Sequence, residues 1–252
     1  MRWLALLLLL SAGPLAASET IVAGLSQNRV AITAQYDGSE ILVYGAVRRD
    51  APLPKGHPLE VIVTVEGPAT PLVIRRKERT AGIWVNAASV TIDAAPSFYA
   101  VATTAPLEDI LSATEDLRHR ITLSNAIRAI GISEEAADSP EFVAALERIR
   151  MAEDRYRMSE GSISFVEQTL FRTDVVLPSN LTEGDYRVRL FLTRGGKVID
   201  KQERVINVRK TGIERFLYNT AHDEPLAYGL ASLLLAVVAG WAASAGFRLL
   251  RR

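Results

Sequence analysis

The chain has 252 residues, no cysteine, and equal numbers of basic and acidic side chains, 29 of each. Without cysteine it forms no disulfide and offers no thiolate to a metal, so its stability has to come from an ordinary hydrophobic core. One basic residue lies in the first 18 positions and three lie in the last five, which leaves 25 against 29 acidic residues between the two ends. This negative balance argues against a nucleic-acid partner.

Residues 1–18 have the pattern of a secretory signal peptide. An apolar run from Trp3 to Leu10 follows Arg2 and is too short to span a bilayer. Ala16 and Ser18 occupy the small-residue positions of a signal peptidase site. We therefore expect cleavage near Ser18 and export of the mature chain, with an uncleaved anchor as the alternative.

Residues 19–106 are expected to form short strands, because they alternate in polarity and are rich in β-branched side chains. The stretches "RVAIT" (29–33) and "SEILVYGAV" (39–47) flank "YDG". Gly38 supplies a permissive turn position there, so this pair is predicted to be a β-hairpin.

The period of the apolar pattern changes at Pro106, and residues 107–160 are predicted to be a helical insert. Apolar residues then recur at intervals of three and four, and "SPE" from Ser139 begins a second helix with a cap residue followed by proline. The residues expected on the apolar faces are Leu107, Ile110, Leu111, Leu117, Ile121, Phe142, Leu146, Ile149 and Tyr156.

Strands are expected again over residues 161–212, where one motif is typical of Greek-key sandwiches. Leu181, Gly184 and Tyr186 form L-x-x-G-x-Y before a strand that alternates in polarity. In such sandwiches the tyrosine hydroxyl bonds back across the preceding corner. The motif favours a mainly β, immunoglobulin-like sandwich with a helical insert, although the cysteine of immunoglobulins is replaced by Val188 and a chance hairpin is the alternative.

Residues 226–247 are predicted to be one transmembrane helix. At about 1.5 Å per residue the segment is roughly 33 Å long, enough to cross a hydrocarbon core of about 30 Å. The short tail, 248–252, carries three arginines and is expected to be cytoplasmic, which places the bulk of the chain in the periplasm and the helix in the inner membrane. The juxtamembrane segment, 213–225, is either an amphipathic segment on the headgroups or a flexible tether.

Small residues recur along the predicted span. Ala236, Gly240 and Ser244 lie four apart and would form one smooth helix face. Such a face lets a second helix approach closely, so beyond the lipid bilayer the expected partner is another membrane protein or a second copy of the chain. The alternative is that this spacing of small residues arises by chance in an alanine-rich helix.

No pattern of catalytic or metal-binding residues is visible. His57, His119 and His222 are scattered, and neither G-x-S-x-G nor a glycine-rich phosphate loop occurs. We expect no cofactor and no enzymatic activity. The stretch "RRKER" contributes Arg75, Arg76, Lys77 and Arg79, a patch for an anion, for anionic headgroups or for an acidic partner, or charges that protect an exposed strand edge.

Several stretches resemble a known family. They are "GIWVN" (82–86), "SFYAVATTAPL" (97–107), "LFRTDVVLP" (170–178), "EGDYRV" (183–188) and "LAYGLASLLLAVVAGWAASAGFR" (226–248). Together they are similar to the alphaproteobacterial transmembrane protein family Alph_Pro_TM over nearly the whole mature chain. That resemblance implies no catalytic residue. It implies a transporter partner, because genes of this family tend to lie beside a permease that resembles a sulfite exporter.

Two functions are therefore expected to compete. In the first, the chain is a non-enzymatic accessory subunit that holds a periplasmic partner and docks its span on another membrane protein. In the second, the periplasmic region binds or senses an anion, such as an oxidised sulfur species, through the "RRKER" patch. The sequence does not name the partner or the ligand.

Overall fold

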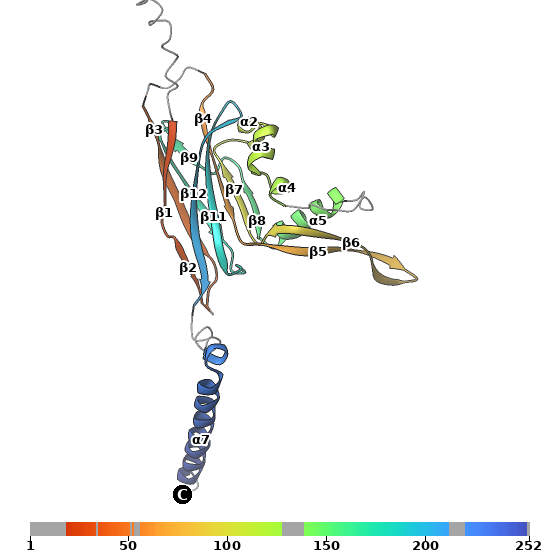
Figure 1. Cartoon of the computed structure of the whole chain (residues 1–252), viewed down its shortest axis with the longest axis vertical. Helices are drawn as coiled ribbons and strands as arrows, with labels where there is room; N and C mark the ends of the chain where they lie inside the picture. Colours follow the sequence, from red (N-terminus) through yellow and green to blue (C-terminus); the bar gives the residue numbers. More distant parts are fainter. Residues whose placement is uncertain are drawn as a thin grey trace, which may run out of the picture. The chain divides into compact units, whose positions relative to one another are not determined.

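The computed structural model describes residues 19–33, 35–50, 52, 56–127, 139–211 and 220–250. They belong to two compact units, Met1–Val30 with Asp37–Val208 and Ala31–Tyr36 with Arg209–Arg252. The predicted signal peptide lies outside the described residues, as do most of the predicted juxtamembrane segment and the last two residues of the tail. The expected mainly β class, with a few helices and one C-terminal apolar helix, is confirmed (Figure 1).

Two sheets form most of the first unit, and the first of them has four antiparallel strands. Its order is β1 (Glu19–Leu25), β3 (Ser39–Arg49), β10 (Leu170–Leu177) and β9 (Ser164–Val166). Along β10 the residues alternate strictly between exposed and buried. One face of this sheet is therefore part of the core and the other is at the surface.

The second sheet has six strands. Its order is β2 (Arg29–Ile32), β12 (Lys197–Lys210), β11 (Gly184–Arg194), β4 (Leu59–Glu66), β7 (Tyr99–Thr103) and β8 (Tyr156–Ser159). The β7–β8 pair is parallel. The hairpin predicted for 29–47 is wrong, because β2 pairs with β12 whereas β3 pairs with β1 and β10 in the other sheet.

The central strands of the six-stranded sheet are buried on both faces. On β4, Val61, Val63 and Val65 alternate with Ile62 and Thr64, and all five are almost fully buried. Ile62 belongs to a cluster formed with helical residues, so its face of the sheet is covered by helices. The opposite face carries the remaining core residues, and the domain has a layer of helices on one sheet.

The described residues of the region predicted as a helical insert contain four helices. They are α2 (Leu107–Ile110), α3 (Ala113–His119), α4 (Leu123–Ala126) and α5 (Ser139–Ala152). The insert ends earlier than expected, because Tyr156 begins strand β8 and is not on a helix. Leu117 and Ile149, which the pattern placed on apolar faces, are exposed. The other predicted positions are buried and pack under the helices or beside them.

The free edge of β1 is covered by side chains of β12. The Asp200 carboxylate accepts a hydrogen bond from the Ile21 amide at 2.6 Å, and the Gln202 side-chain oxygen accepts one from the Ala23 amide at 2.9 Å. Arg204 donates to the Ala23 carbonyl at 3.3 Å. Three alternate side chains of β12 thus form hydrogen bonds with backbone groups of β1 to which a further strand could otherwise bind. These bonds protect the edge from pairing with another chain.

The corner predicted from L-x-x-G-x-Y is present. The hydroxyl of Tyr186 donates to the Thr182 carbonyl at 2.9 Å, and the ring is fully buried. Gly184 has φ +152°, and a Cβ there would lie 2.7 Å from Pro68 Cγ. Glycine is therefore needed at this turn, and Leu181 packs into the core nearby.

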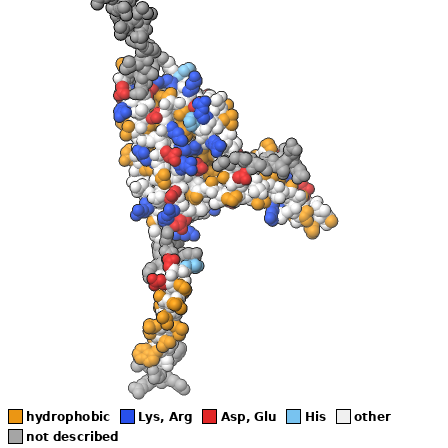
Figure 2. All heavy atoms as spheres, in the orientation of Figure 1, with side chains coloured by type: hydrophobic (Ala, Val, Ile, Leu, Met, Phe, Trp, Pro, Cys, Tyr) orange, Lys and Arg blue, Asp and Glu red, His pale blue; other side chains and the backbone are white. Residues whose placement is uncertain are grey.

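A long two-stranded hairpin, β5 (Ala69–Thr80) with β6 (Ile83–Pro96), is inserted between β4 and β7. Only its base packs on the domain, through Leu72, Ile74 and Ile92. In Figure 1 the rest of the hairpin projects from the sheets as an arm. Figure 2 shows hydrophobic side chains gathered at the end of this arm.

The second unit contains helix α7 (Pro225–Leu250). Its segment Pro225–Ser244 is long and apolar enough to cross a membrane, with a mean hydropathy of 1.9 and no part of it buried in the protein. Among the described residues it is the one helix with these properties. The helix contains the predicted span, 226–247, and extends it by a residue at its start and by three at its end.

Candidate functional site

The residues of "RRKER" lie on β5, but they do not converge. Successive side chains of a strand point to opposite faces. Arg76 therefore points to the face of Leu72 and Ile74, while Arg75, Lys77 and Arg79 line the other face. Residues two apart on a strand are about 7 Å apart, so these three side chains form a row along the strand.

Arg76 is already engaged by neighbouring groups. Its guanidinium lies 3.3 Å from a Glu78 carboxylate oxygen and 3.6 Å from one of Glu141, and it stacks over the ring of Phe142 at 5.6 Å. These contacts fasten β5 to α5, beside a cleft of about 500 Å³ between the two elements. Arg76 thus serves as a structural contact, and the predicted patch is divided between two faces.

A groove on the outer face of the four-stranded sheet was not anticipated from the sequence. Val22, Ala46, Leu170 and Val166 pair across four neighbouring strands and form one continuous apolar row. Three of these side chains are more than half exposed. With Tyr44 they border an open groove of about 530 Å³.

On the groove face a glycine lies beneath an aromatic ring. A Cβ at Gly24 would lie 3.0 Å from the Tyr44 ring, whereas Gly45 pairs with Phe171, whose ring is buried on the core side of the sheet. The ring of Tyr44 therefore lies flat against β1 and extends the apolar row, while Arg172 and Ser164 stand at the rim. The signal was present in the sequence as apolar residues at outward positions of "ILVYGAV" and "LFRTDVVL".

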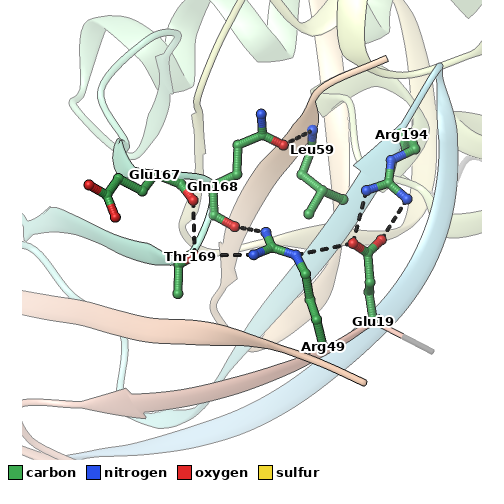
Figure 3. A network of polar contacts seen from close by, with 7 residues as sticks. All are labelled: Glu19, Arg49, Leu59, Glu167, Gln168, Thr169 and Arg194. Carbon is green, nitrogen blue, oxygen red and sulfur yellow. Dashed lines mark hydrogen bonds and ion pairs between the residues drawn. The ribbon is translucent and has the colours of Figure 1, made fainter. Parts of the chain in front are cut away.

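A polar network around a carboxylate and two arginines joins four segments at one end of the sheets, namely β1, β3, β11 and the β9–β10 turn (Figure 3). Glu19 lies 3.1 Å from Arg49 and 2.6 Å from Arg194, and its side chain is 4% exposed. Arg49 also donates to the Gln168 carbonyl and to the Thr169 hydroxyl. Gln168 and its neighbour Glu167 have φ near +50°, so Arg49 stabilises a tight β9–β10 turn in the left-handed region.

A second buried network surrounds Arg189 on β11. Its guanidinium donates to Thr64 at 3.1 Å and to the Tyr99 hydroxyl at 3.0 Å. It also donates to the carbonyls of His119 and Arg120 at 2.6 and 2.9 Å, where α3 ends. A buried cation at a helix C-terminus is favourable, so this residue ties the helical layer to the sheet.

The pKa shifts in this region have structural causes. Burial raises the pKa of the Tyr99 hydroxyl well above its usual value, although the nearby Arg189 opposes the shift. Burial also raises the pKa of Tyr156 to about 12. The pKa of His119 is lowered by burial and by three nearby cations, against the attraction of Glu115. Tyr99 and Tyr156 are buried in the core, where their hydroxyls donate to the Ile121 and Pro96 carbonyls, and His119 lies 3.4 Å from Glu115.

The described residues hold no group of three or more His, Cys, Asp or Glu side chains that could bind a metal. His57 lies beside Gly195, His119 lies on α3, and His222 belongs to the second unit. The absence of enzymatic activity and of a cofactor stays a prediction.

On α7 the predicted small face is exposed. Ala236, Gly240 and Ser244 lie in one helix at intervals of four, and all three are at the surface of the chain. A Cβ at Gly240 would meet nothing within 4 Å. The helix therefore offers a stripe that another helix can approach closely, whereas its packing partner stays a prediction.

The solved structures to which the chain is similar include two bacterial proteins, both of low similarity. The sporulation control protein Spo0M from Bacillus subtilis is 9% identical at a TM-score of 0.30, over 82% of this chain and 56% of that one. BslA, a bacterial hydrophobin, is 11% identical at a TM-score of 0.22, over 79% of this chain and all of that one. No curated protein matches the chain.

A family model matches residues 20–249, almost the whole chain. Its description is "Putative transmembrane protein (Alph_Pro_TM)". The match agrees with the apolar helix α7 and with the resemblance of the quoted stretches, and together they indicate a single-pass membrane protein. The chain belongs to the Alph_Pro_TM family of transmembrane proteins.

Proposed function

We propose that this protein is a non-enzymatic, membrane-anchored accessory subunit whose β domain binds a polypeptide partner in the groove around Leu170. The observation that carries the proposal is the apolar row that crosses four strands on an otherwise solvent-facing sheet. An antiparallel sheet normally presents polar side chains on such a face. A contiguous exposed apolar patch rimmed by polar residues is typical of a protein interaction site.

The shape of the groove favours a polypeptide over a small molecule. Small-molecule sites are concave and enclose most of the ligand, whereas this groove is open along a sheet face. Tyr44 and Arg172 stand at its border, and tyrosine and arginine are the residue types that contribute most to protein interfaces. The partner is expected to be a membrane protein, because the chain itself is anchored by α7.

The strand order supports an immunoglobulin-like arrangement for this domain. In variable-type immunoglobulin domains one sheet has the order A, B, E, D, and the other contains G, F, C and C′ as neighbours. Here β1, β3, β10 and β9 follow the first order, and β12, β11, β4 and β7 follow the second. The buried tyrosine corner at Tyr186 belongs to the same pattern. The parallel strand β8 is a departure from it.

The proposed orientation places the β domain in the periplasm and the C-terminus of α7 in the cytoplasm, with the helix in the inner membrane. It is supported by the signal-peptide pattern at one end and by three arginines after the span at the other. An anion-binding role linked to sulfur export is the weaker alternative, because Arg76 is already paired and the remaining cations of its patch lie on the opposite face.

The test is photo-crosslinking of the full chain in its native membranes. A photoreactive phenylalanine analogue is placed at Tyr44 or Val166 in the groove and, as a control, at Val205, which is exposed on the other sheet. We expect one adduct from both groove positions and none from the control, with Leu170→Arg removing the adduct. Adducts only to a second copy of the chain, or equal adducts from the control, would contradict the accessory role.

A further inference from the structure

We propose that the free end of the β5–β6 hairpin binds an anionic phospholipid surface. Beyond Arg76 the hairpin is not buried by the other described residues: from Lys77 to Asn86 every residue except Val85 is exposed, and Val85 is half-buried. Two-stranded ribbons of this kind are at best marginally stable alone in water. A free ribbon that exposes large apolar side chains is therefore expected to have a binding role.

The register of the hairpin shows which side chains share a face. Arg79 pairs with Trp84, Lys77 with Asn86, and Arg75 with Ser89. A register shift between Arg76 and Lys77 keeps these pairs on one face of the ribbon. That face consequently carries three cations and a tryptophan, whereas Glu78 lies on the opposite face, where it pairs with Arg76.

The cations of this face are available for a ligand. In the part of the chain that the structure describes, no acidic side chain forms an ion pair with Arg75, Lys77 or Arg79, and all three are exposed. Their spacing of about 7 Å along the strand suits a row of separate phosphate groups. A lipid surface offers such a row without the fixed geometry that a folded acidic protein would have to match.

The tip is apolar on both faces, which distinguishes a lipid surface from an acidic polypeptide. Ile83 is 65% exposed on one face and Trp84 is 67% exposed on the other. Ala81 and Gly82 make the turn with φ of 51° and 89°, so the tip is narrow and carries no bulky polar group. Tryptophan favours the headgroup region, and arginine and lysine can keep their charges at the phosphates while their stems lie among apolar groups.

The arrangement therefore matches a membrane-interface wedge, with apolar residues at the tip and cations behind them on one face. Each basic residue close to an anionic membrane contributes about 1 kcal/mol. Three such residues correspond to a change in partitioning of about 100-fold. Because α7 anchors the chain, the hairpin is tethered to a membrane. Even a weak interaction between the hairpin and lipid would therefore be populated.

The experiment uses the full chain in zwitterionic nanodiscs, with Trp3→Phe and Trp241→Phe so that Trp84 is the only tryptophan. Vesicles with brominated acyl chains are added, made of phosphatidylcholine alone or with phosphatidylglycerol. We expect Trp84 fluorescence to be quenched by the vesicles that contain phosphatidylglycerol. The quenching should disappear at about 1 M salt, where charges are screened within about 3 Å.

Two charge variants decide the role of the hairpin. Arg75→Gln with Lys77→Gln and Arg79→Gln is expected to weaken partitioning by about 100-fold. The control, Arg29→Gln with Arg48→Gln and Lys197→Gln, removes the same charge from exposed positions elsewhere and should bind as the parent does. The proposal would be overturned if anionic vesicles failed to quench Trp84, or if both variants lost the same amount of vesicle binding. It would also be overturned if the protein bound polyglutamate but not anionic vesicles. The groove around Leu170 is unchanged in all these proteins, so its crosslinks test the accessory role separately.

Discussion

Glu19 and Arg194, 175 residues apart in the chain, form a bidentate ion pair in which Nη1 lies 2.6 Å from Oε2 and Nη2 lies 2.9 Å from Oε1. Arg49 contacts the same carboxylate at 3.1 Å. Glu19 is also the residue that directly follows the predicted signal peptide. The start of β1 is thereby joined to strands β3 and β11.

Replacement of Glu19 by Ala should destabilise the β domain by about 3 kcal/mol, because two mostly buried guanidinium groups would lose their charge partner. The comparison is Glu203→Gln in the exposed pair with Arg187, where a loss below about 1 kcal/mol is expected. Urea unfolding of the detergent-solubilised full chain measures both. Equal effects of the two changes would show that burial of the Glu19 carboxylate contributes nothing.

Tyr186→Phe should lower the free energy of unfolding by about 1 kcal/mol, because the buried corner loses the hydrogen bond to the Thr182 carbonyl. Tyr44→Phe is the matched control, since that tyrosine lies at the surface of the groove. The same urea titration checks the prediction. A Tyr186→Phe variant as stable as the control would mean that the corner is held by packing alone.

Lowering the pH should weaken the domain through His119. Its folded pKa is lowered by burial first and then by Lys201, Arg118 and Arg189, against the opposing effect of Glu115. A histidine with a lowered folded pKa is stabilising while it is neutral, so stability is fully present above its unfolded pKa of about 6.5 and falls as the pH drops below that value.

The measurement for His119 is the free energy of unfolding between about pH 7.5 and pH 5.5, an interval that includes the unfolded pKa. His119→Asn should be less stable than the parent at the higher pH but should lose less stability on acidification. His57→Asn, on a residue for which no such network exists in the described structure, is the control. A parent and a His119→Asn variant with identical slopes would contradict the assignment.

The proposed membrane orientation predicts a protease-accessible β domain. Protease added outside spheroplasts should digest residues before α7, whereas a reporter fused after Arg252 should behave as a cytoplasmic protein. Mass spectrometry of the processed chain should find its first residue close to Glu19. Protection of the β domain with an exported reporter would reverse the topology and remove the basis for a periplasmic partner.

The small face of α7 predicts close helix packing. Gly240→Leu with Ser244→Leu should reduce recovery of a crosslinked partner, or of a second copy, because the leucines block approach of another backbone. Insertion should be unaffected, since leucine is highly compatible with lipid. Leu234→Ala with Leu235→Ala, on the opposite side of the helix from this stripe, is the control. Equal recovery from parent and leucine variant would leave the helix as an anchor only.

The sequence predicted a local feature of this fold correctly wherever the residues that produce the feature lie in one short segment. The span needs only the apolar run before the terminal arginines, and the corner needs only the spacing of Leu181, Gly184 and Tyr186. Helix α5 likewise begins at the predicted Ser139–Pro140 start and buries Phe142 and Leu146, which lie four residues apart. In each case the physical requirement, solvation in lipid, a tight turn or a satisfied helix end, is met by neighbouring residues.

Strand pairing and the surfaces it creates were decided only by the tertiary structure. The pattern of "RVAIT" and "SEILVYGAV" predicted a hairpin. In the structure β2 pairs instead with β12, which is far from it in the sequence. The row from Val22 to Val166 exists because four distant segments align in one register. The sequence by itself determined the anchor, the element types and the corner. Only long-range pairing, whose partners no local pattern specifies, assembled the groove. The division of the "RRKER" cations between two faces follows from the alternation of side chains along β5.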